Sequence, residues 1–370
     1  MFNSVLRAFI KLRLIELGYP LEGNSKGGRS VPIFRKGDDM DTNTVKAGVV
    51  IAPRRMILQG AAALGLSPLI ARAQSSPMIR IGVPTKTYFP TIIAETALRQ
   101  KLYEKEGIRA EITIYRSGAE GFEALAAGAT DLIYNSSSSV AAGLMKGVRS
   151  RCVANGGLGY YGWHMMVKPD SPIKIMAELN GKKVGITSAG SGSDILALWA
   201  AANQKVQFSR VPVGGGGLVP NLLSGNLDAT VLYSPLTYQV MQAKQARSIA
   251  DFGELVPPHS TGSWIASDKF INERGPVLQK ALNALYGGIA FLRNPANRTT
   301  AIKLIAEIDE IPEPIAAAEL DGNIVKLSTT GEFKIEWMER ALEMAKLIGM
   351  TNLAPASEIY TTKFAPVPTK

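Results

Sequence analysis

The chain has 370 residues and carries 41 Lys and Arg against 31 Asp and Glu, a formal net charge of +10. Residues 1–73 hold 11 of the basic and 5 of the acidic residues, so the remaining chain carries only about +4. This small surplus argues against nucleic-acid binding, which needs basic residues clustered on one face, but it is compatible with an anionic ligand. The single cysteine, Cys152, excludes an internal disulfide and a metal site built from several thiolates.

The front of the chain resembles an export signal. Residues 53–73 place an arginine pair before a short apolar run that glycine and proline interrupt, and the run ends in the small-x-small cleavage pattern Ala71-Arg72-Ala73. The run is too short to span a bilayer, which needs roughly 20 apolar residues. The pattern is typical of a twin-arginine signal cleaved after Ala73; the alternative is a chance arginine pair before a core helix.

Residues 1–52 are unusually long for the leader of a signal. We expect a disordered N-terminal extension or a wrongly assigned start, with Met40 as an alternative first residue. The signal contains no cysteine to lipidate, so an exported protein would need a second membrane to retain it. This favours the periplasm.

A short pattern occurs twice, about a hundred residues apart: ALAAGATDLIYNSS at residues 124–137 and NLLSGNLDATVLYSP at residues 221–235. Each copy predicts a helix closed by a glycine, an aspartate three residues later, and a short buried strand that ends in small polar residues. Ligands of open α/β sheets bind beyond the carboxyl ends of strands. The repeat therefore predicts polar groups from two separate halves facing one cleft.

The first half alternates strands and helices, which predicts a parallel three-layer lobe: strand 78–84, helix 91–107, strand 110–115, helix 140–147 and strand 150–154. Residues 157–162, GLGYYG, match G-x-G-x-x-G. A dinucleotide fingerprint must open a helix, however, and residues 163–167 predict a strand. We interpret this segment as a glycine-rich crossover between two lobes.

The second half restarts the pattern with strand 182–187 and helix 195–203, joined by the glycine-serine loop 188–194. Glycines allow a ligand to approach the backbone, and free N–H groups at a helix start favour anions. Ser193 or Asp194 could instead simply cap the helix. The following elements are strand 208–213, the glycines 214–217 (a close-approach loop or a flexible turn), helix 237–246 and strand 248–252.

Residues 261–266 predict the return to the first lobe, and four helices follow, over residues 275–292, 295–308, 313–327 and 333–348. The mature chain, about 78–365, resembles the solute-binding proteins of bacterial ABC importers for nitrate, sulfonates, taurine and thiamine-precursor pyrimidines. The resemblance is carried by IRIGVPTKTYFPTIIAE, EGFEALAAGATDLIYNSSSSVAAGLMKG, LNGKKVGITSAGSGSDILALWAA, SGNLDATVLYSP and WIASDKFINE. The cysteine-rich pocket motif of the pyrimidine branch is absent.

The resemblance implies a type II-like, two-lobed periplasmic binding protein fold, each lobe a parallel or mixed sheet flanked by helices, with a two-strand hinge. Lobe 1 would comprise residues 78–166 and 261–370, and lobe 2 residues 167–260. The implied ligand-binding residues are Thr87, Tyr88, Phe89, Asn135, Ser136, Ser188, Ser191, Ser193, Tyr233 and Ser234.

Some residues near this cleft have alternative interpretations. Tyr88 and Phe89 could instead be core anchors. Trp163 and Trp264 lie on the crossovers, where we favour packing. Arg116 is a candidate cation, but we favour its interpretation as an exposed loop residue.

The implied function is the periplasmic component of an ABC importer that captures a small anionic organic solute by hinge closure and delivers it to a membrane permease, as a monomer without cofactor. The alternative is an enzyme on the same fold, similar to menaquinone-pathway enzymes or pyrimidine synthases. With only His164 and His259, neither in a motif, no catalytic residue or metal ligand is predicted. Asp309, Glu310 and Glu313 are interpreted as solvated turn residues.

Overall fold

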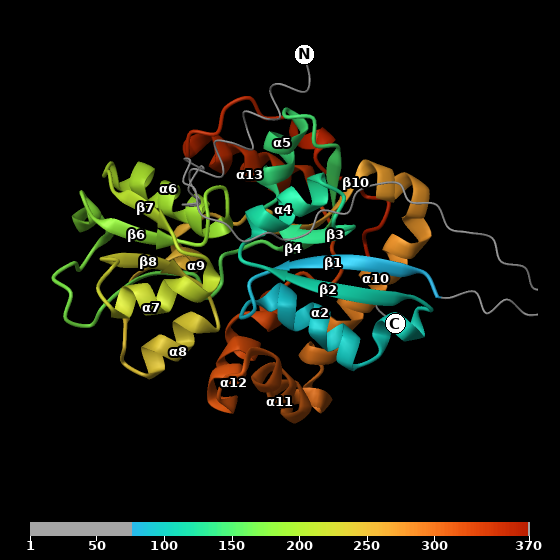
Figure 1. The fold of residues 1–370 in the computed structure, drawn as a ribbon, viewed down its shortest axis with the longest axis horizontal. Helices are drawn as coiled ribbons and strands as arrows, with labels where there is room; N and C mark the ends of the chain where they lie inside the picture. Colours follow the sequence, from blue (N-terminus) through green and yellow to red (C-terminus); the bar gives the residue numbers. More distant parts are fainter. Residues whose placement is uncertain (1–75, 369–370) are drawn as a thin grey trace, which may run out of the picture. The chain divides into compact units, whose positions relative to one another are not determined.

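The computed structural model describes residues 76–368, so the expected extension 1–52 and signal 53–73 lie outside the described residues. Two five-stranded sheets form its framework (Figure 1). Within the described range, no helix combines the length and apolar character needed to cross a membrane.

The first sheet has the strand order β2-β1-β3-β10-β4. Its strands are β1 (Met78–Pro84), β2 (Arg109–Tyr115), β3 (Leu132–Asn135), β4 (Ser150–Gly157) and β10 (Gly262–Ser267). β1 pairs in parallel with β2 and β3, but β10 runs antiparallel between β3 and β4. The first sheet is therefore mixed rather than purely parallel, one of the two arrangements that the resemblance implies, because the strand that returns late in the chain enters from the opposite direction.

The second sheet has the order β7-β6-β8-β5-β9 and repeats this plan. Its strands are β5 (His164–Val167), β6 (Lys183–Ile186), β7 (Ser209–Pro212), β8 (Ala229–Leu232) and β9 (Arg247–Asp251). β6 is parallel to β7 and β8, whereas β5 runs antiparallel between β8 and β9. In each sheet, the antiparallel strand is the one that arrives from the other sheet.

The chain crosses between the sheets twice, and the two crossovers lie side by side. The His259 N–H donates to the Leu158 carbonyl at 3.0 Å, and the Thr261 N–H donates to the Gly157 carbonyl at 3.2 Å. The segment GLGYYG is one of these crossovers, as its sequence predicts, and no helix follows it. The first crossing begins after Gly157, earlier than the expected boundary at residues 166–167.

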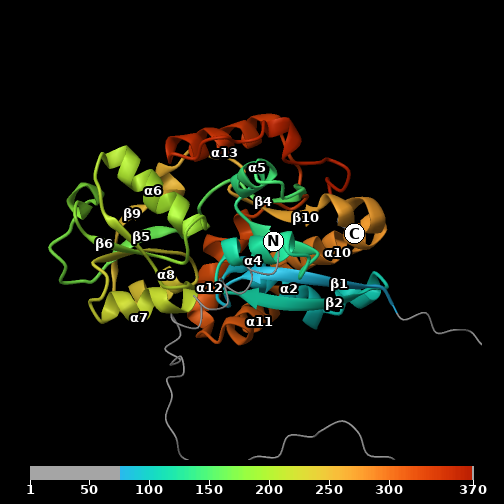
Figure 2. The same ribbon diagram turned by 45° about the horizontal axis from the view of Figure 1, so that its top comes forward.

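Helices cover both faces of the first sheet (Figures 1 and 2). They are α2 (Phe89–Arg99), α3 (Leu102–Lys105), α4 (Gly118–Ala126), α5 (Ser138–Leu144) and α10 (Asp268–Arg293). The helix expected over residues 91–107 divides into α2 and α3 because Lys101 adopts a left-handed φ of +57°. Successive residues of β3 enter different cores: Leu132 and Tyr134 pack with α2 and α10, while Ile133 packs with α4 and α5.

In the second sheet, α6 (Gly192–Gln204) covers one face, and α7 (Leu218–Leu223) and α8 (Leu236–Gln242) cover the other (Figure 2). The short α9 (Phe252–Leu255) precedes the return crossover. The C-terminal helices are α11 (Arg298–Asp309), α12 (Glu313–Gly322) and α13 (Ile335–Leu347). Met344 of α13 and the following Ile348 join the core of the second sheet, so this helix spans both halves.

The aspartates of the repeated pattern have a structural role. The Asp131 carboxylate accepts from the Arg80 backbone N–H at 2.9 Å and from Arg80 Nη2 at 2.7 Å. The Asp228 carboxylate likewise accepts from the Lys183 N–H at 2.8 Å. Each aspartate ties the start of one strand to its parallel neighbour, and the polar residues at the other end of the strand are left to face the cleft.

Candidate functional site

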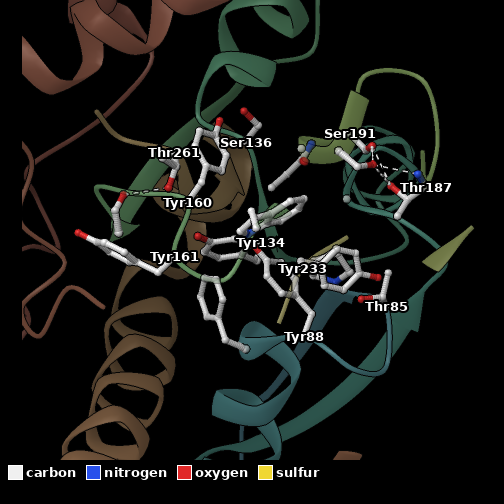
Figure 3. Close-up of a pocket in the computed structure, with 18 of the residues that line it drawn as sticks. Thr85, Tyr88, Tyr134, Ser136, Tyr160, Tyr161, Thr187, Ser191, Tyr233 and Thr261 are labelled. Atoms are coloured by element: carbon white, nitrogen blue, oxygen red, sulfur yellow. Dashed lines mark hydrogen bonds between the residues drawn. The ribbon is translucent and has the colours of Figure 1, made fainter. Parts of the chain in front are cut away.

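A pocket lies where the carboxyl ends of strands from both sheets face each other (Figure 3). Its lining residues come from loops of both halves: Pro84, Thr85, Tyr88, Phe89, Ser117, Gly118, Tyr134, Asn135, Ser136, Gly157, Gly159, Tyr160, Tyr161, Trp163, Thr187, Ser191, Gly192, Ser193, Tyr233, Thr261, Asn323 and Leu327. The pocket has a volume of about 660 Å³ when its mouth is included, but little of that space is wide enough for a water molecule. Side chains fill most of the pocket in this conformation, so parts of the protein must move before a ligand can enter.

Seven of the ten predicted ligand-binding residues line this pocket: Tyr88, Phe89, Asn135, Ser136, Ser191, Ser193 and Tyr233. The other three do not. Thr87 lines an outer cavity with Lys86, and Ser188 lies at the outer rim. Ser234 is buried behind the pocket, where its hydroxyl accepts from Asn323 Nδ2 at 3.0 Å.

Three hydroxyls are held together at the start of α6. Thr187 Oγ1 lies 2.8 Å from Ser191 Oγ and 3.0 Å from Ser193 Oγ, and the two serine hydroxyls are 2.9 Å apart. Ser193 Oγ also accepts from the Thr187 N–H at 2.9 Å. Ser191, rather than Ser193 or Asp194, caps the helix by accepting from the Asp194 N–H. These hydroxyls are therefore engaged in local structure as well as facing the pocket.

Hydrogen bonds connect the two halves at the rim. The Ser188 hydroxyl donates to Ser117 Oγ at 2.8 Å, and the Gly215 N–H donates to the Arg116 carbonyl at 3.2 Å. A Cβ at Gly215 would lie 2.4 Å from Thr85 Cγ2, so the glycine loop 214–217 serves close approach of the chain rather than a free turn. These contacts exist only while the halves are together.

Aromatic side chains form most of the pocket wall. The ring of Tyr88 lies 5.5 Å from that of Trp163 and 5.0 Å from that of Tyr233, centroid to centroid, and the latter two rings are also 5.0 Å apart. Tyr88 follows a strand of the first sheet, whereas Trp163 and Tyr233 adjoin strands of the second, so the two contacts of Tyr88, one edge-to-face and one tilted, cross the cleft. Trp163 thus lines the pocket, while Trp264 is fully buried against Tyr134.

Burial and nearby aromatic groups keep Tyr88, Tyr134 and Tyr233 protonated. Desolvation raises the pKa of Tyr88 and Tyr134 well above the ordinary value, and it raises the pKa of Tyr233 to about 12. Burial disfavours the charged phenolate because the low-dielectric surroundings solvate it poorly. The tyrosine hydroxyls therefore remain neutral donors and acceptors at neutral pH.

No Lys, Arg, His, Asp or Glu is among the described residues that line the pocket. Arg116, the candidate cation, has a side chain 84% exposed and pairs with Glu120 at 3.3 Å on the outer rim. His164 lies on β5 outside the pocket, where its Nδ1 is 2.9 Å from Ser248 Oγ. The site is consequently a neutral pocket of hydroxyls, amides and aromatic rings, and the described residues contain no group of side chains suited to hold a metal ion.

Asp309 is not the solvated turn residue that its neighbouring prolines predict. Asp309 is only 3% exposed, and neither of its carboxylate oxygens has a hydrogen-bond partner in the described part of the chain. Burial, followed by the charge of Glu319, raises the pKa of Asp309 to about 8. Burial also raises the pKa of Glu319, on α12, to about 7. Glu310 is exposed and pairs with Lys86, as expected of a turn residue.

Several lining residues were missed by sequence reasoning. Ser117 carries a usable signal, the capping-box spacing Ser-x-x-Glu: its hydroxyl accepts from the Glu120 N–H at 3.2 Å. Tyr160 and Tyr161 lie within the GLGYYG crossover, which was predicted only as a connection. Asn323 has no local signal, because it reaches the pocket from the end of α12 through tertiary packing.

These features define the periplasmic binding protein fold, with a pocket between two α/β halves. A family model described as NMT1/THI5 like matches residues 88–298, more than half of the chain, so the chain belongs to this family. A solved structure, the alkanesulfonate-binding protein from Xanthomonas axonopodis pv. citri bound to MOPS, superposes with a TM-score of 0.65 at 17% identity. The superposition covers 80% of this chain and 98% of that one.

Curated relatives of this chain are also named as binding proteins. A protein of Brucella abortus (strain 2308), named only as a candidate binding protein, is 29% identical over 185 residues, which cover 50% of this chain and 56% of the relative. A candidate aliphatic sulfonates-binding protein of Escherichia coli (strain K12) is 27% identical over 161 residues, covering 42% of this chain and 49% of that protein. The matched region thus spans about half the length of these curated relatives.

Proposed function

We propose that the protein is the substrate-binding component of an ABC importer and captures a small organic solute by closure of two lobes. The observation that carries this proposal is the pocket itself, whose lining comes from both sheets and whose rim is held by the Ser117–Ser188 hydrogen bond. A ligand that contacts both halves has more contacts in the closed state, and that difference in affinity drives closure. Family membership and the names of the relatives support the same function.

The lobes would be residues 78–166 with 261–370, and residues 167–260. The place of β5 in the second sheet favours moving the first boundary to the crossover at residues 158–163. The ten residues predicted from the resemblance remain our candidates for ligand contact. The seven that line the pocket are stronger candidates than Thr87, Ser188 and Ser234, which lie at its rim or behind it.

The expected solutes are anions of the sulfonate, taurine or nitrate type. Export through a twin-arginine-like signal, cleavage after Ala73, residence in the periplasm as a monomer and delivery to an inner-membrane permease complete the proposal. Intact mass measurement of the exported protein tests the cleavage site, since the mature chain would begin at Gln74.

The enzyme alternative gains no support from the pocket. Covalent catalysis needs a nucleophile with an adjacent base, and general acid–base catalysis needs a group that titrates near neutral pH. Among the described lining residues, the titratable side chains are tyrosines, and burial raises the pKa of Tyr88 and Tyr233. Binding is what this arrangement favours.

A disulfide across the rim tests lobe closure directly. The hydroxyls of Ser117 and Ser188 are 2.8 Å apart, so cysteines at both positions are within reach of a disulfide. The native Cys152 will not interfere, because it is buried and burial raises the pKa of its thiol to about 12. We expect the oxidised Ser117→Cys/Ser188→Cys protein to take up solute at least tenfold more slowly than the reduced form.

The measurement is the rate of radiolabelled or fluorescent solute uptake by the purified protein, with and without reductant. The single Ser188→Cys variant is the matched control, and its uptake should not respond to reductant. Equal uptake by the oxidised and reduced double variants would show that the lobes do not need to separate, and the proposed mechanism would then be wrong.

A further inference from the structure

The pocket contains two buried hydroxyls that neighbour each other and have hydrogen-bonding capacity left for a ligand. Thr85 is 7% exposed and Tyr233 is 2% exposed, and both line the pocket. In the described part of the chain, neither Thr85 Oγ1 nor Tyr233 Oη has a hydrogen-bond partner. A buried polar group without a partner is costly and calls for an explanation, such as a ligand that completes it.

These hydroxyls are close neighbours on opposite sides of the cleft. A Cβ at Gly215 would lie 2.4 Å from Thr85 Cγ2 and 2.7 Å from Tyr233 Oη, so one small volume touches both side chains. Thr85 follows β1 and holds a left-handed φ of +57°, while Tyr233 follows β8. By contrast, the hydroxyls of Thr187, Ser191 and Ser193 already bond one another. Thr85 and Tyr233 can at most bond each other, so both hydroxyls keep hydrogen-bonding capacity for a ligand.

The surrounding wall is aromatic and uncharged. The rings of Tyr88 and Trp163 each lie 5.0 Å from the ring of Tyr233, centroid to centroid, and 5.5 Å from each other. These contacts are edge-to-face or tilted. An aromatic ligand ring gains quadrupole contacts in such a wall, about 0.5–1.5 kcal/mol per pair beyond its buried area, that a flexible aliphatic chain does not gain. No described lining residue can form an ion pair with the ligand, so its head group must be recognised by hydrogen bonds.

Resting on the proposed function, we infer that the solute is a small planar aromatic compound whose compact oxygen-bearing head group bonds the Thr85 and Tyr233 hydroxyls. Its ring lies among Tyr88, Trp163 and Tyr233 and thereby contacts both lobes. Selectivity then comes from ring shape and neutral hydrogen bonds rather than from a basic side chain. The compound can carry a delocalised single negative charge, because hydroxyls and helix N-termini offer partial positive charge to oxygen.

The first test compares matched probes that share a head group and carbon count. Calorimetry measures the binding of benzenesulfonate against hexane-1-sulfonate, benzoate against heptanoate, and benzamide against heptanamide. We expect the aromatic member of at least one pair to bind tenfold or more tightly than its aliphatic partner. Aliphatic members that bind as tightly, or an aromatic set in which nothing binds, would overturn the inference.

The second test removes one hydroxyl. Tyr233→Phe should weaken the tightest aromatic probe about tenfold, and it should leave the unfolding midpoint unchanged or higher because an unsatisfied polar atom is removed. Tyr103→Phe is the matched control, since Tyr103 is also a buried tyrosine but lies outside the pocket, and its affinity should be unchanged. Unchanged affinity in Tyr233→Phe would overturn the assigned head-group contact.

Failure of these tests is distinguishable from failure of the proposed function. If the disulfide across Ser117 and Ser188 still controls the uptake of a non-aromatic solute, the importer function stands and the aromatic inference falls. If the disulfide has no effect on any solute that binds, the lobe-closure function itself fails.

Discussion

Asp309 and Glu319 are carboxylic acids held away from water behind the binding pocket. Glu319 is fully buried, and its Oε1 accepts from Asn323 Nδ2 at 2.8 Å, while its Oε2 has no partner in the described chain. Asp309 lacks partners altogether there, and the nearby Lys86 offsets only part of the burial cost because it pairs with Glu310. The folded protein therefore favours the protonated, neutral form of both acids.

This protonation makes stability depend on pH. Burial raises the pKa of Asp309 from 3.8 to about 8. The folded chain thus holds more protons than the unfolded chain between about pH 4 and pH 8. The free energy of unfolding should fall as pH rises through this window, and Asp309→Asn should remove much of the slope. At pH 8 we expect the variant to gain on the order of 2 kcal/mol over the wild type.

Urea denaturation at pH 5 and pH 8 measures this difference. Glu310→Gln is the control, because Glu310 is adjacent but exposed and water screens its pair with Lys86, which therefore contributes little to stability. A variant Asp309→Asn with the full wild-type slope would show that Asp309 is ionised in the folded protein.

At the scale of single elements, α6 begins at the edge of the pocket and depends on its first residues. Ser191 caps the helix, and Asp194 accepts from the Gly190 N–H at 2.8 Å and pairs with Arg210. A helix whose first N–H groups lose their acceptor is destabilised, because those groups have no partner inside the helix. The glycine-serine loop therefore stabilises the start of α6 in addition to lining the pocket.

Ser191→Ala should lower the free energy of unfolding by about 1 kcal/mol, the usual contribution of a helix-capping serine. Ser188→Ala, in the same loop, should change stability by less than about 0.5 kcal/mol because its hydroxyl bonds only across the rim. Chemical denaturation of the two purified variants measures both values. Equal losses in the two variants would contradict the capping role of Ser191.

Local pattern predicts the elements well where the chain is regular. β1 is found at the predicted residues 78–84, and the paired repeats mark α4 with β3 and α7 with β8. The pattern does not reveal the direction of β5 and β10, because strand direction depends on the neighbouring strands rather than on the strand itself. It also misjudges Asp309, since prolines beside an acid indicate a turn but not what later packs over it.

In the candidate site, too, some residues can be predicted from the sequence and others cannot. Residues that directly follow a strand, such as Asn135 and Tyr233, can be placed from sequence because carboxyl ends of strands meet at the cleft. Thr85 and Asn323 cannot, because Thr85 depends on an unusual backbone conformation and Asn323 on packing of the C-terminal helices. Neutrality of the pocket is likewise a tertiary property: Arg116 lies close in sequence to Ser117 yet points to the rim.

At the scale of the whole described chain, two sheets with the same strand plan are joined by two hydrogen-bonded crossovers. Each sheet receives its antiparallel strand from the other half, so the crossovers sit beside the pocket and can act as a hinge. Few polar contacts join the halves: the Ser188–Ser117 and Gly215–Arg116 bonds at the rim and the Asn323–Ser234 bond behind the pocket, and water can replace each partner once the halves separate. The closed arrangement should therefore open readily without ligand.

Small-angle scattering should detect this opening. We expect the ligand-free protein to have a larger radius of gyration than the oxidised Ser117→Cys/Ser188→Cys variant, which is held closed, and a saturating ligand should bring the wild type to the value of the locked variant. The reduced double variant serves as the control and should scatter like the ligand-free wild type. Identical profiles for the locked and ligand-free forms would mean that the protein is closed at rest, so that ligand entry would have to depend on movement of the rings of Tyr88, Trp163 and Tyr233 alone.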